Sequence, residues 1–178
     1  MQRDGASGWG RYHPGAMDVR LAIAADAEAI RTIYNAEVLG STATFDLRPR
    51  SLDAQREWVE RHQGAYPALV AVEQATVIGF GSLSPFRERP AYATTVEDSV
   101  YVAESWRGRG VGRLLLGELV RAGGRWGFHT VIARVSADNS PSIGLHQAVG
   151  FELVGVEREI GRKFGRWLDV AVLQLMLA

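Results

Sequence analysis

Three glycines and three arginines share one short stretch of this 178-residue chain, and their order suggests anion binding. Residues 107–113 read Arg-Gly-Arg-Gly-Val-Gly-Arg, follow the apolar run 100–102 and open an apolar helical pattern at Val111. Glycines leave backbone N–H groups uncovered, and the first turn of a helix carries partial positive charge. Together these features favour a phosphate group. The sequence therefore predicts a site for a phosphorylated cofactor at residues 107–113.

Two familiar phosphate loops do not fit this stretch. A P-loop needs Lys and then Ser or Thr after its glycine, whereas Gly112 is followed by Arg113 and Leu114. A dinucleotide fingerprint needs glycine at 113 and an acid near 130, where the chain has Thr130. The spacing that fits is Arg-x-x-Gly-x-Gly at 107, 110 and 112, which resembles the pyrophosphate loop of the GNAT superfamily of N-acetyltransferases. The alternative is an ordinary glycine-rich turn.

A second motif follows at the distance that the superfamily has. Residues 139–151 are typical of a short helix that is capped by Asn139 or Ser140, has Pro141 in its first turn and ends at Gly150. The superfamily carries Asn-x-x-Ser-x-x-Leu-Tyr-x-x-x-Gly-Phe here. The matching residues are Asn139, Ser142, Leu145, Gly150 and Phe151, while His146 stands at the tyrosine position.

A narrower resemblance rests on residues 95–102 and 161–170. The first segment reads Thr-Val-Glu-x-Ser-Val-Tyr-Val and the second Gly-Arg-Lys-Phe-Gly-Arg-Trp-Leu-Asp-Val. Both are similar to the phosphinothricin and methionine sulfoximine acetyltransferases, and the resemblance covers about residues 18–178. It implies transfer of an acetyl group from acetyl-CoA to the amino group of a small amino-acid analogue of the phosphinothricin, methionine sulfoximine or methionine sulfone type. It also implies a cytoplasmic homodimer.

Composition narrows the remaining classes of function. The 20 basic and 20 acidic side chains balance, so we expect neither nucleic acid nor an anionic membrane as a partner. The chain has no cysteine and its four histidines lack ligand-like spacing, so no metal is expected. No apolar segment is long enough to span a bilayer. Residues 1–16 are glycine-rich and are expected to form a flexible extension, followed by one domain over 17–178.

Hydrophobic periodicity predicts alternating strands and helices, and hence an α/β fold. The resemblance makes this a GNAT fold, one domain whose mixed, mostly antiparallel central sheet is flanked by helices. Strands are expected near residues 19–23, 68–72, 77–83, 94–103, 130–135, 153–160 and 167–177. Helices are expected near residues 26–39, 51–62, 111–123 and 139–150.

Acetyl transfer from a thioester to an amine needs a base and a route for the thiolate to leave, but no covalent enzyme intermediate. Glu97 is the candidate general base, because burial in an apolar strand raises the pKa of a carboxylate. This role comes from the resemblance; from spacing alone, Glu97 reads as a solvent-facing strand residue. His146 is the second candidate, to protonate the thiolate or to take a proton from the amine. The alternative for His146 is a packed or capping histidine.

The remaining site residues follow from the resemblance. The main chain of 100–102 is expected to bind the pantetheine arm like an added strand and to offer an N–H to the thioester oxygen. Asn139 and Ser142 are expected to contact pantetheine or phosphate, or to cap their helix. The predicted acetyl-CoA contacts are Val100, Tyr101, Val102, Arg107, Gly108, Arg109, Gly110, Val111, Gly112, Arg113, Asn139 and Ser142. The predicted acceptor contacts are Phe45, Phe86, Arg87, Tyr92 and Thr95, with 163–167 completing the pocket.

Two other functions stay open at this point. The chain is alternatively a non-catalytic domain that binds or senses acyl-CoA, having kept the fold and lost turnover. Within the enzyme class, the acceptor is alternatively a different amine, such as a polyamine, an aminoglycoside or a protein N-terminus. The absence of an acidic excess weighs against polycationic acceptors.

Overall fold

Seven strands and four α-helices lie along residues 17–177, the part of the chain that the computed structural model describes. The strands are β1 (Asp18–Leu21), β2 (Ala68–Glu73), β3 (Thr76–Pro85), β4 (Thr95–Val102), β5 (Thr130–Ser136), β6 (Glu152–Lys163) and β7 (Arg166–Met176). The helices are α1 (Ala27–Gly40), α2 (Leu52–Arg61), α3 (Val111–Arg125) and α4 (Ser140–Val149), with short 3₁₀ turns at Ala24–Asp26, Pro90–Tyr92 and Glu104–Trp106. The predicted extension, residues 1–16, lies outside the described residues.

The helix boundaries have the local causes expected from the sequence. The Ser51 side chain accepts a hydrogen bond from the N–H of Ala54 at 3.2 Å and so caps α2. Asn139 caps α4 in the same way through the N–H of Ser142, also at 3.2 Å. Gly150 ends α4 in the left-handed conformation with φ of 108°. These caps confirm the predicted limits of both helices.

All seven strands form one sheet in the order β1-β2-β3-β4-β5-β7-β6. Every neighbouring pair is antiparallel except β4 and β5, which are parallel. The predicted GNAT fold with a mixed, mostly antiparallel sheet is therefore confirmed. The β6–β7 hairpin is longer than expected, because β6 continues past an irregularity between Glu157 and Gly161.

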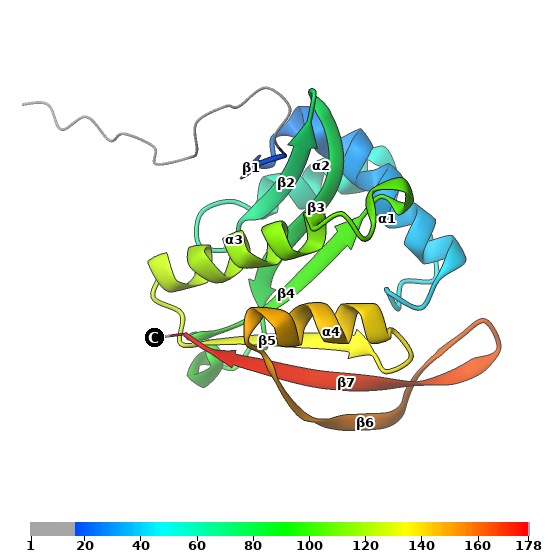
Figure 1. Cartoon of the computed structure of the whole chain (residues 1–178), viewed down its shortest axis with the longest axis vertical. Helices are drawn as coiled ribbons and strands as arrows, with labels where there is room; N and C mark the ends of the chain where they lie inside the picture. Colours follow the sequence, from blue (N-terminus) through cyan, green and yellow to red (C-terminus); the bar gives the residue numbers. More distant parts are fainter. Residues whose placement is uncertain (1–16, 178) are drawn as a thin grey trace, which may run out of the picture.

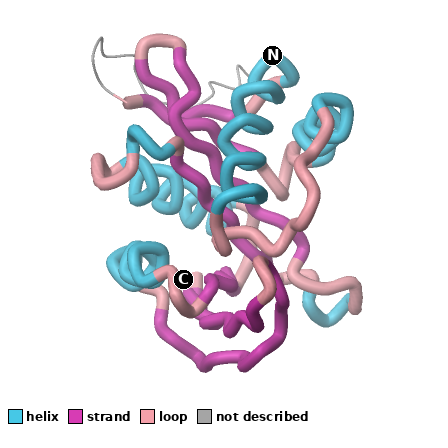
Figure 2. The backbone as a smooth tube through the Cα atoms, turned by 90° about the vertical axis from the view of Figure 1, so that its right-hand side faces the viewer, coloured by secondary structure: helices cyan, strands magenta, loops and turns pink. Residues whose placement is uncertain are grey.

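Helices cover both faces of the sheet, with α3 and α4 in front and α1 and α2 behind in Figure 1 and on opposite sides in Figure 2. The front core contains Leu119 and Val96, and the rear core contains Ile30 and Phe80. Alternate residues of a strand point to opposite faces. Strand β4 therefore contributes Val96 to the front core and packs Tyr101 against the rear core.

Two glycines in β3 bring α3 close to the sheet. A Cβ atom on Gly81 would lie 2.8 Å from Leu119 Cδ1, and a Cβ atom on Gly79 would lie 3.2 Å from Val111 Cγ1. Gly79 is also the pairing partner of Val102 at the end of β4. Side chains at these two positions would push the helix away. Their absence places the first turn of α3 beside the end of β4, where the phosphate site was predicted.

Candidate active site

A cleft of about 630 Å³ lies where β4 and β5 separate. The two strands pair only at Thr95–Thr130, Val96–Val131 and Glu97–Ile132. Beyond Glu97, β4 pairs with β3 alone, so the other edge of β4 presents main-chain groups to the cleft. The cleft is lined by Glu37, Ser41, Thr42, Ala43, Val100, Tyr101, Val102, Trp106, Arg107, Gly108, Gly110, Val111, Gly112, Arg113, Asp138, Asn139, Pro141, Ser142 and Leu145.

The glycine-rich loop forms one end of this cleft and leads into α3. Gly108 and Gly110 have positive φ of 73° and 85°, which L side chains rarely adopt. No side chain caps the start of α3 at Gly110. The first N–H groups of a helix have no partner within it, so those of residues 111–113 remain available at the positive end of the helix dipole. This end of the cleft is chemically suited to a diphosphate.

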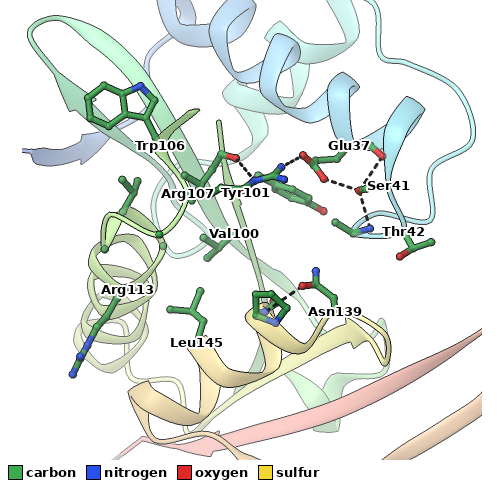
Figure 3. A pocket seen from close by; sticks show the side chains of 18 of the residues that line it. Glu37, Ser41, Thr42, Val100, Tyr101, Trp106, Arg107, Arg113, Asn139 and Leu145 are labelled. Atoms are coloured by element: carbon green, nitrogen blue, oxygen red, sulfur yellow. Dashed lines mark hydrogen bonds and ion pairs between the residues drawn. The ribbon is translucent and has the colours of Figure 1, made fainter. Parts of the chain in front are cut away.

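The loop arginines differ in what they do. Arg107 reaches across the cleft to Glu37 of α1 and also donates to the carbonyl oxygen of Val102 at 3.3 Å, as Figure 3 shows. The guanidinium of Arg109 lies over the Trp106 ring, 4.9 Å from its centroid, and Arg109 does not line the cleft. Arg113 lines the cleft but extends away from Glu37 in Figure 3. Arg107 therefore ties the loop to α1.

Glu37 is a cleft residue that the sequence analysis missed. It is buried at 8% exposure, and the Ser41 hydroxyl donates to its carboxylate at 2.6 Å. The buried Lys163 ammonium donates to the Thr44 carbonyl oxygen at 2.7 Å and so joins the loop after α1 to the β6–β7 hairpin. A signal was present in the sequence, because Glu37 falls on the apolar face of α1 with Ile33 and Tyr34.

The opposite lip of the cleft is formed by the start of α4. Asn139 and Ser142 both line the cleft, while the Asn139 side-chain oxygen is engaged in capping α4. Asp138 binds the Ser136 hydroxyl at 2.7 Å and the Arg166 guanidinium at 2.8 Å. These hydrogen bonds, with the Ser136 hydroxyl as the largest influence, lower the pKa of the Asp138 carboxyl below its usual range. This lip is thus anchored to β5 and β7.

Glu97 points to the rear face of the sheet, the α1/α2 side. The Asp98 side chain contacts His146 of α4 on the front face. Successive residues of a strand point to opposite faces, so the neighbouring Glu97 side chain points to the rear. Burial raises the pKa of the Glu97 carboxyl, and the nearby Arg134 partly opposes that rise. The group is half-buried at the last pair before β4 and β5 separate. A carboxylate in this setting is a suitable proton acceptor.

His146 lies on the front face and beneath the cleft, with an exposure of 4%. Its Nδ1 is 2.7 Å from the Ser142 carbonyl oxygen, and its Nε2 is 3.1 Å from Asp98 Oδ2. Burial, the largest single influence, lowers the pKa of His146, but the hydrogen bond to Asp98, the charge of Asp98 and the Ser142 carbonyl together outweigh burial, and the pKa is raised. When it is protonated, the ring donates from Nδ1 to the Ser142 carbonyl oxygen and from Nε2 to the Asp98 carboxylate. In this arrangement His146 has no free nitrogen with which to accept a proton.

The predicted acceptor residues lie outside the cofactor cleft. Phe86, Arg87 and Tyr92 form one cluster in the β3–β4 connection, where the Arg87 guanidinium lies 4.9 Å from the Phe86 ring centroid. Phe45 packs on Gly161 of β6 so closely that a Cβ atom there would lie 2.1 Å from Phe45 Cε2. Thr95 points to the same face as Glu97 by strand alternation. The predicted cofactor contacts, apart from Arg109, therefore line the cleft, and the predicted acceptor residues do not.

Residues 17–177 contain neither a cluster of metal-ligating side chains nor a membrane-spanning helix. No group of three or more His, Asp or Glu side chains there is placed to hold a metal ion. No helix in this part of the chain has the length and apolar character needed to cross a bilayer.

Comparison with known proteins agrees with this geometry. Residues 28–151 match the Acetyltransferase (GNAT) family. The chain is 39% identical over 162 residues to the L-methionine sulfoximine/L-methionine sulfone acetyltransferase of Salmonella typhimurium. This match covers 90% of this chain and 95% of that protein. It is 38% identical over 164 residues to the phosphinothricin N-acetyltransferase of Streptomyces coelicolor, spanning 89% of this chain and 96% of that protein.

Solved structures show the same likeness. The crystal structure of a GNAT superfamily phosphinothricin acetyltransferase from Sinorhizobium meliloti, in complex with acetyl-CoA, matches this chain with a TM-score of 0.88 and 40% identity. The match covers 91% of this chain and 89% of that one.

Proposed function

The chain belongs to the GNAT family of acetyltransferases, and on that premise we propose that it acetylates the amino group of a small amino-acid analogue of the phosphinothricin, methionine sulfoximine or methionine sulfone type. The observation that carries this proposal is the cleft along the open edge of β4 at Val100–Val102, which lies between the uncapped, glycine-rich start of α3 and the start of α4. The activities of the relatives supply the acceptor class.

Acetyl-CoA fits the donor groups of the cleft. The N–H groups at the start of α3, between Gly110 and Arg113, would hold its diphosphate. The open edge of β4 at Val100–Val102 would hydrogen-bond its pantetheine amides. Asn139 and Ser142 would contact the same arm from the α4 lip. The thioester would then lie near the point where the two strands separate.

The acceptor amine is proposed to approach Glu97 from the rear face of the sheet. Its nitrogen attacks the thioester carbonyl carbon, its proton passes to the Glu97 carboxylate, and the carbon–sulfur bond breaks to release the thiolate of CoA. A main-chain N–H of Val100–Val102 would stabilise the developing oxyanion. Holding both reactants in line lowers the activation free energy, by on the order of 7–11 kcal/mol in favourable cases.

His146 is proposed to act from the cofactor side of β4. Its two hydrogen bonds are those of an imidazolium, which has a proton to donate to the leaving thiolate and none to accept from the amine. Donation would require the bond to Asp98 to open, since the ring lies beneath the cleft. Positioning of α4 requires no such movement, and the observed geometry favours that role.

The proposal is tested by thiol release from acetyl-CoA in the presence of a panel of amines. We expect release with phosphinothricin, methionine sulfoximine or methionine sulfone to exceed release with polyamines, aminoglycosides and peptide N-termini. Tight binding of acetyl-CoA without release for any amine would indicate the non-catalytic alternative. Release with one of the other amines alone would retain the enzyme class and replace the acceptor.

We also propose that the protein is a homodimer in the cytoplasm, without nucleic acid, membrane or metal as a partner. Support for self-association comes from the β6–β7 hairpin, an edge of the sheet with exposed apolar side chains. These side chains are Leu153, Val154, Val156, Ile160, Phe164 and Trp167. Exposed apolar edges favour pairing with another chain. Light scattering that gives a single-chain mass at micromolar concentration would contradict this.

A further inference from the structure

A pair of oppositely charged side chains lies on the same face of the sheet as Glu97. Arg134 of β5 forms an ion pair with Glu157 of β6, and their side chains are 36% and 35% exposed. The two residues lie opposite Val172 and Val170 of the intervening strand β7, so both side chains bridge that strand. The pair is accessible to a ligand from solvent.

Strand register places this pair beside the candidate base. Ile132 is the β5 partner of Glu97, and Arg134 is two residues further along, so Arg134 points to the same face as Ile132. Arg134 is also past the last pair between β4 and β5, at the level where the strands have separated. Both charges of the pair are close enough to influence the pKa of Glu97, which Arg134 lowers and Glu157 raises.

Arg87, on the other side of Glu97, differs from Arg134 in its partners. Its guanidinium lies over the rings of Phe86 and Tyr92, and it forms no ion pair with any residue in 17–177. Glu97 therefore has two arginines nearby, one without a carboxylate partner and one neutralised by Glu157. An amino-acid acceptor likewise has two oxygen-bearing ends, its α-carboxylate and its side chain.

Stability does not account for the Arg134–Glu157 pair. Ion pairs with this exposure contribute about 0–1 kcal/mol, because water screens them and two long side chains lose freedom. The pair is also too polar to serve as packing for β7. Its position beside the half-buried Glu97 carboxylate indicates a role in recognition.

We propose that Arg134 and Glu157 form a specificity pair that reads the side chain of the acceptor. This inference rests on the proposed function. Arg134 offers N–H donors to the side-chain oxygens of the acceptor, while Glu157 cancels its charge. Uncharged oxygen groups, such as a sulfone, can share those donors with Glu157. A side chain with a full negative charge, such as a phosphinate, meets a repulsive carboxylate and is disfavoured.

The test compares methionine sulfone and phosphinothricin as acceptors, with kcat/KM measured by thiol release. Glu157→Gln keeps the shape of the side chain and removes its charge. We expect this variant to raise the phosphinothricin-to-sulfone ratio of kcat/KM by about tenfold, the effect of about 1.4 kcal/mol in differential binding. Arg134→Gln leaves Glu157 unneutralised, so the same ratio is expected to fall by about tenfold.

Glu118→Gln is the matched control, because it removes an ion pair with Arg121 on the exposed side of α3, away from the rear face. The control is expected to keep the wild-type ratio. Ratios within twofold of wild type in both Glu157→Gln and Arg134→Gln, with both acceptors turned over, would overturn the specificity pair alone. Binding of acetyl-CoA without acetylation of either acceptor by the wild-type enzyme would overturn the proposed function and this inference with it.

Discussion

Replacing Asp98 by Asn tests whether the buried Asp98–His146 pair holds α4 against β4 beneath the cleft. The side chains of Asp98 and His146 are 1% and 5% exposed, so water scarcely screens their interaction. The second carboxylate oxygen of Asp98, Oδ1, is buried without a partner in the described chain, so the ion pair is its main compensation for burial. An amide at position 98 keeps the shape and removes the charge.

The expected loss of stability follows from this geometry. Breaking a buried ion pair costs about 3–5 kcal/mol when the remaining charge cannot neutralise. His146 can lose its proton, so the smaller figure for a hydrogen bond to a charged group applies, about 1.5–3 kcal/mol. For a chain of this size each kcal/mol lowers Tm by about 2–4 °C, so Asp98→Asn should lower Tm by about 3–12 °C.

The loss should depend on pH with a definite sign. The pKa of His146 is raised in the folded protein, mainly by Asp98 acting against burial. Its stabilising contribution is therefore complete below the unfolded pKa of about 6.5 and disappears as pH rises through the folded pKa. The difference between wild type and Asp98→Asn should be largest near pH 6 and should shrink towards pH 9.

The assay is urea denaturation followed by circular dichroism at several pH values from 5.5 to 9. Asp53→Asn is the matched control, since Asp53 forms an exposed pair with Arg56. That control should change the free energy of unfolding by less than about 0.5 kcal/mol at every pH. An Asp98→Asn protein as stable as wild type at pH 6, or a deficit that does not vary with pH, would refute the reasoning.

Three further predictions concern the site. Glu97→Gln should lower kcat by about 10²–10⁴-fold. In the wild-type enzyme the raised pKa of Glu97 should make kcat fall on acidification at a pH above the usual range for a carboxylate, and the variant should lack this fall. An unchanged kcat near neutral pH would exclude Glu97 as the base. Gly161→Ala should displace the Phe45 ring and lower kcat/KM for the acceptor by about 10–100-fold without altering the Kd of acetyl-CoA. Loss of acetyl-CoA binding instead would mean that Phe45 contacts the cofactor and not the acceptor. Arg107→Gln should leave Glu37 without its cation and lower the free energy of unfolding by about 1–3 kcal/mol, measured by urea denaturation; full stability would mean that the ion pair does not hold the loop to α1.

Local signals were sufficient for much of the fold. The capping side chains Ser51 and Asn139 and the terminating Gly150 act within a few residues of themselves, so the sequence alone placed the limits of α2 and α4. The glycine-rich stretch and the Asn139–Phe151 motif pointed to the family that the comparisons then confirmed.

Contacts between distant segments were not predictable in this way. Glu37 and Arg107 are 70 residues apart, and Asp98 and His146 are 48 apart, so no local pattern joins either pair. Alternation along β4 would have put Glu97 and Asp98 on opposite faces, but it did not identify α4 as the partner of Asp98. The separation of β4 from β5 after Glu97, which creates the cleft, likewise depends on how the whole sheet assembles.

The central claim is that main-chain N–H groups at the start of α3 capture the diphosphate of acetyl-CoA. Isothermal titration calorimetry with acetyl-CoA and with acetyl-pantetheine, which lacks the diphosphate together with the 3′-phosphoadenosine attached to it, tests it most directly. We predict that acetyl-CoA binds at least about 100-fold more tightly, equivalent to roughly two hydrogen bonds to a charged group. Equal affinity for the two compounds, or no heat of binding with acetyl-CoA, would contradict the account.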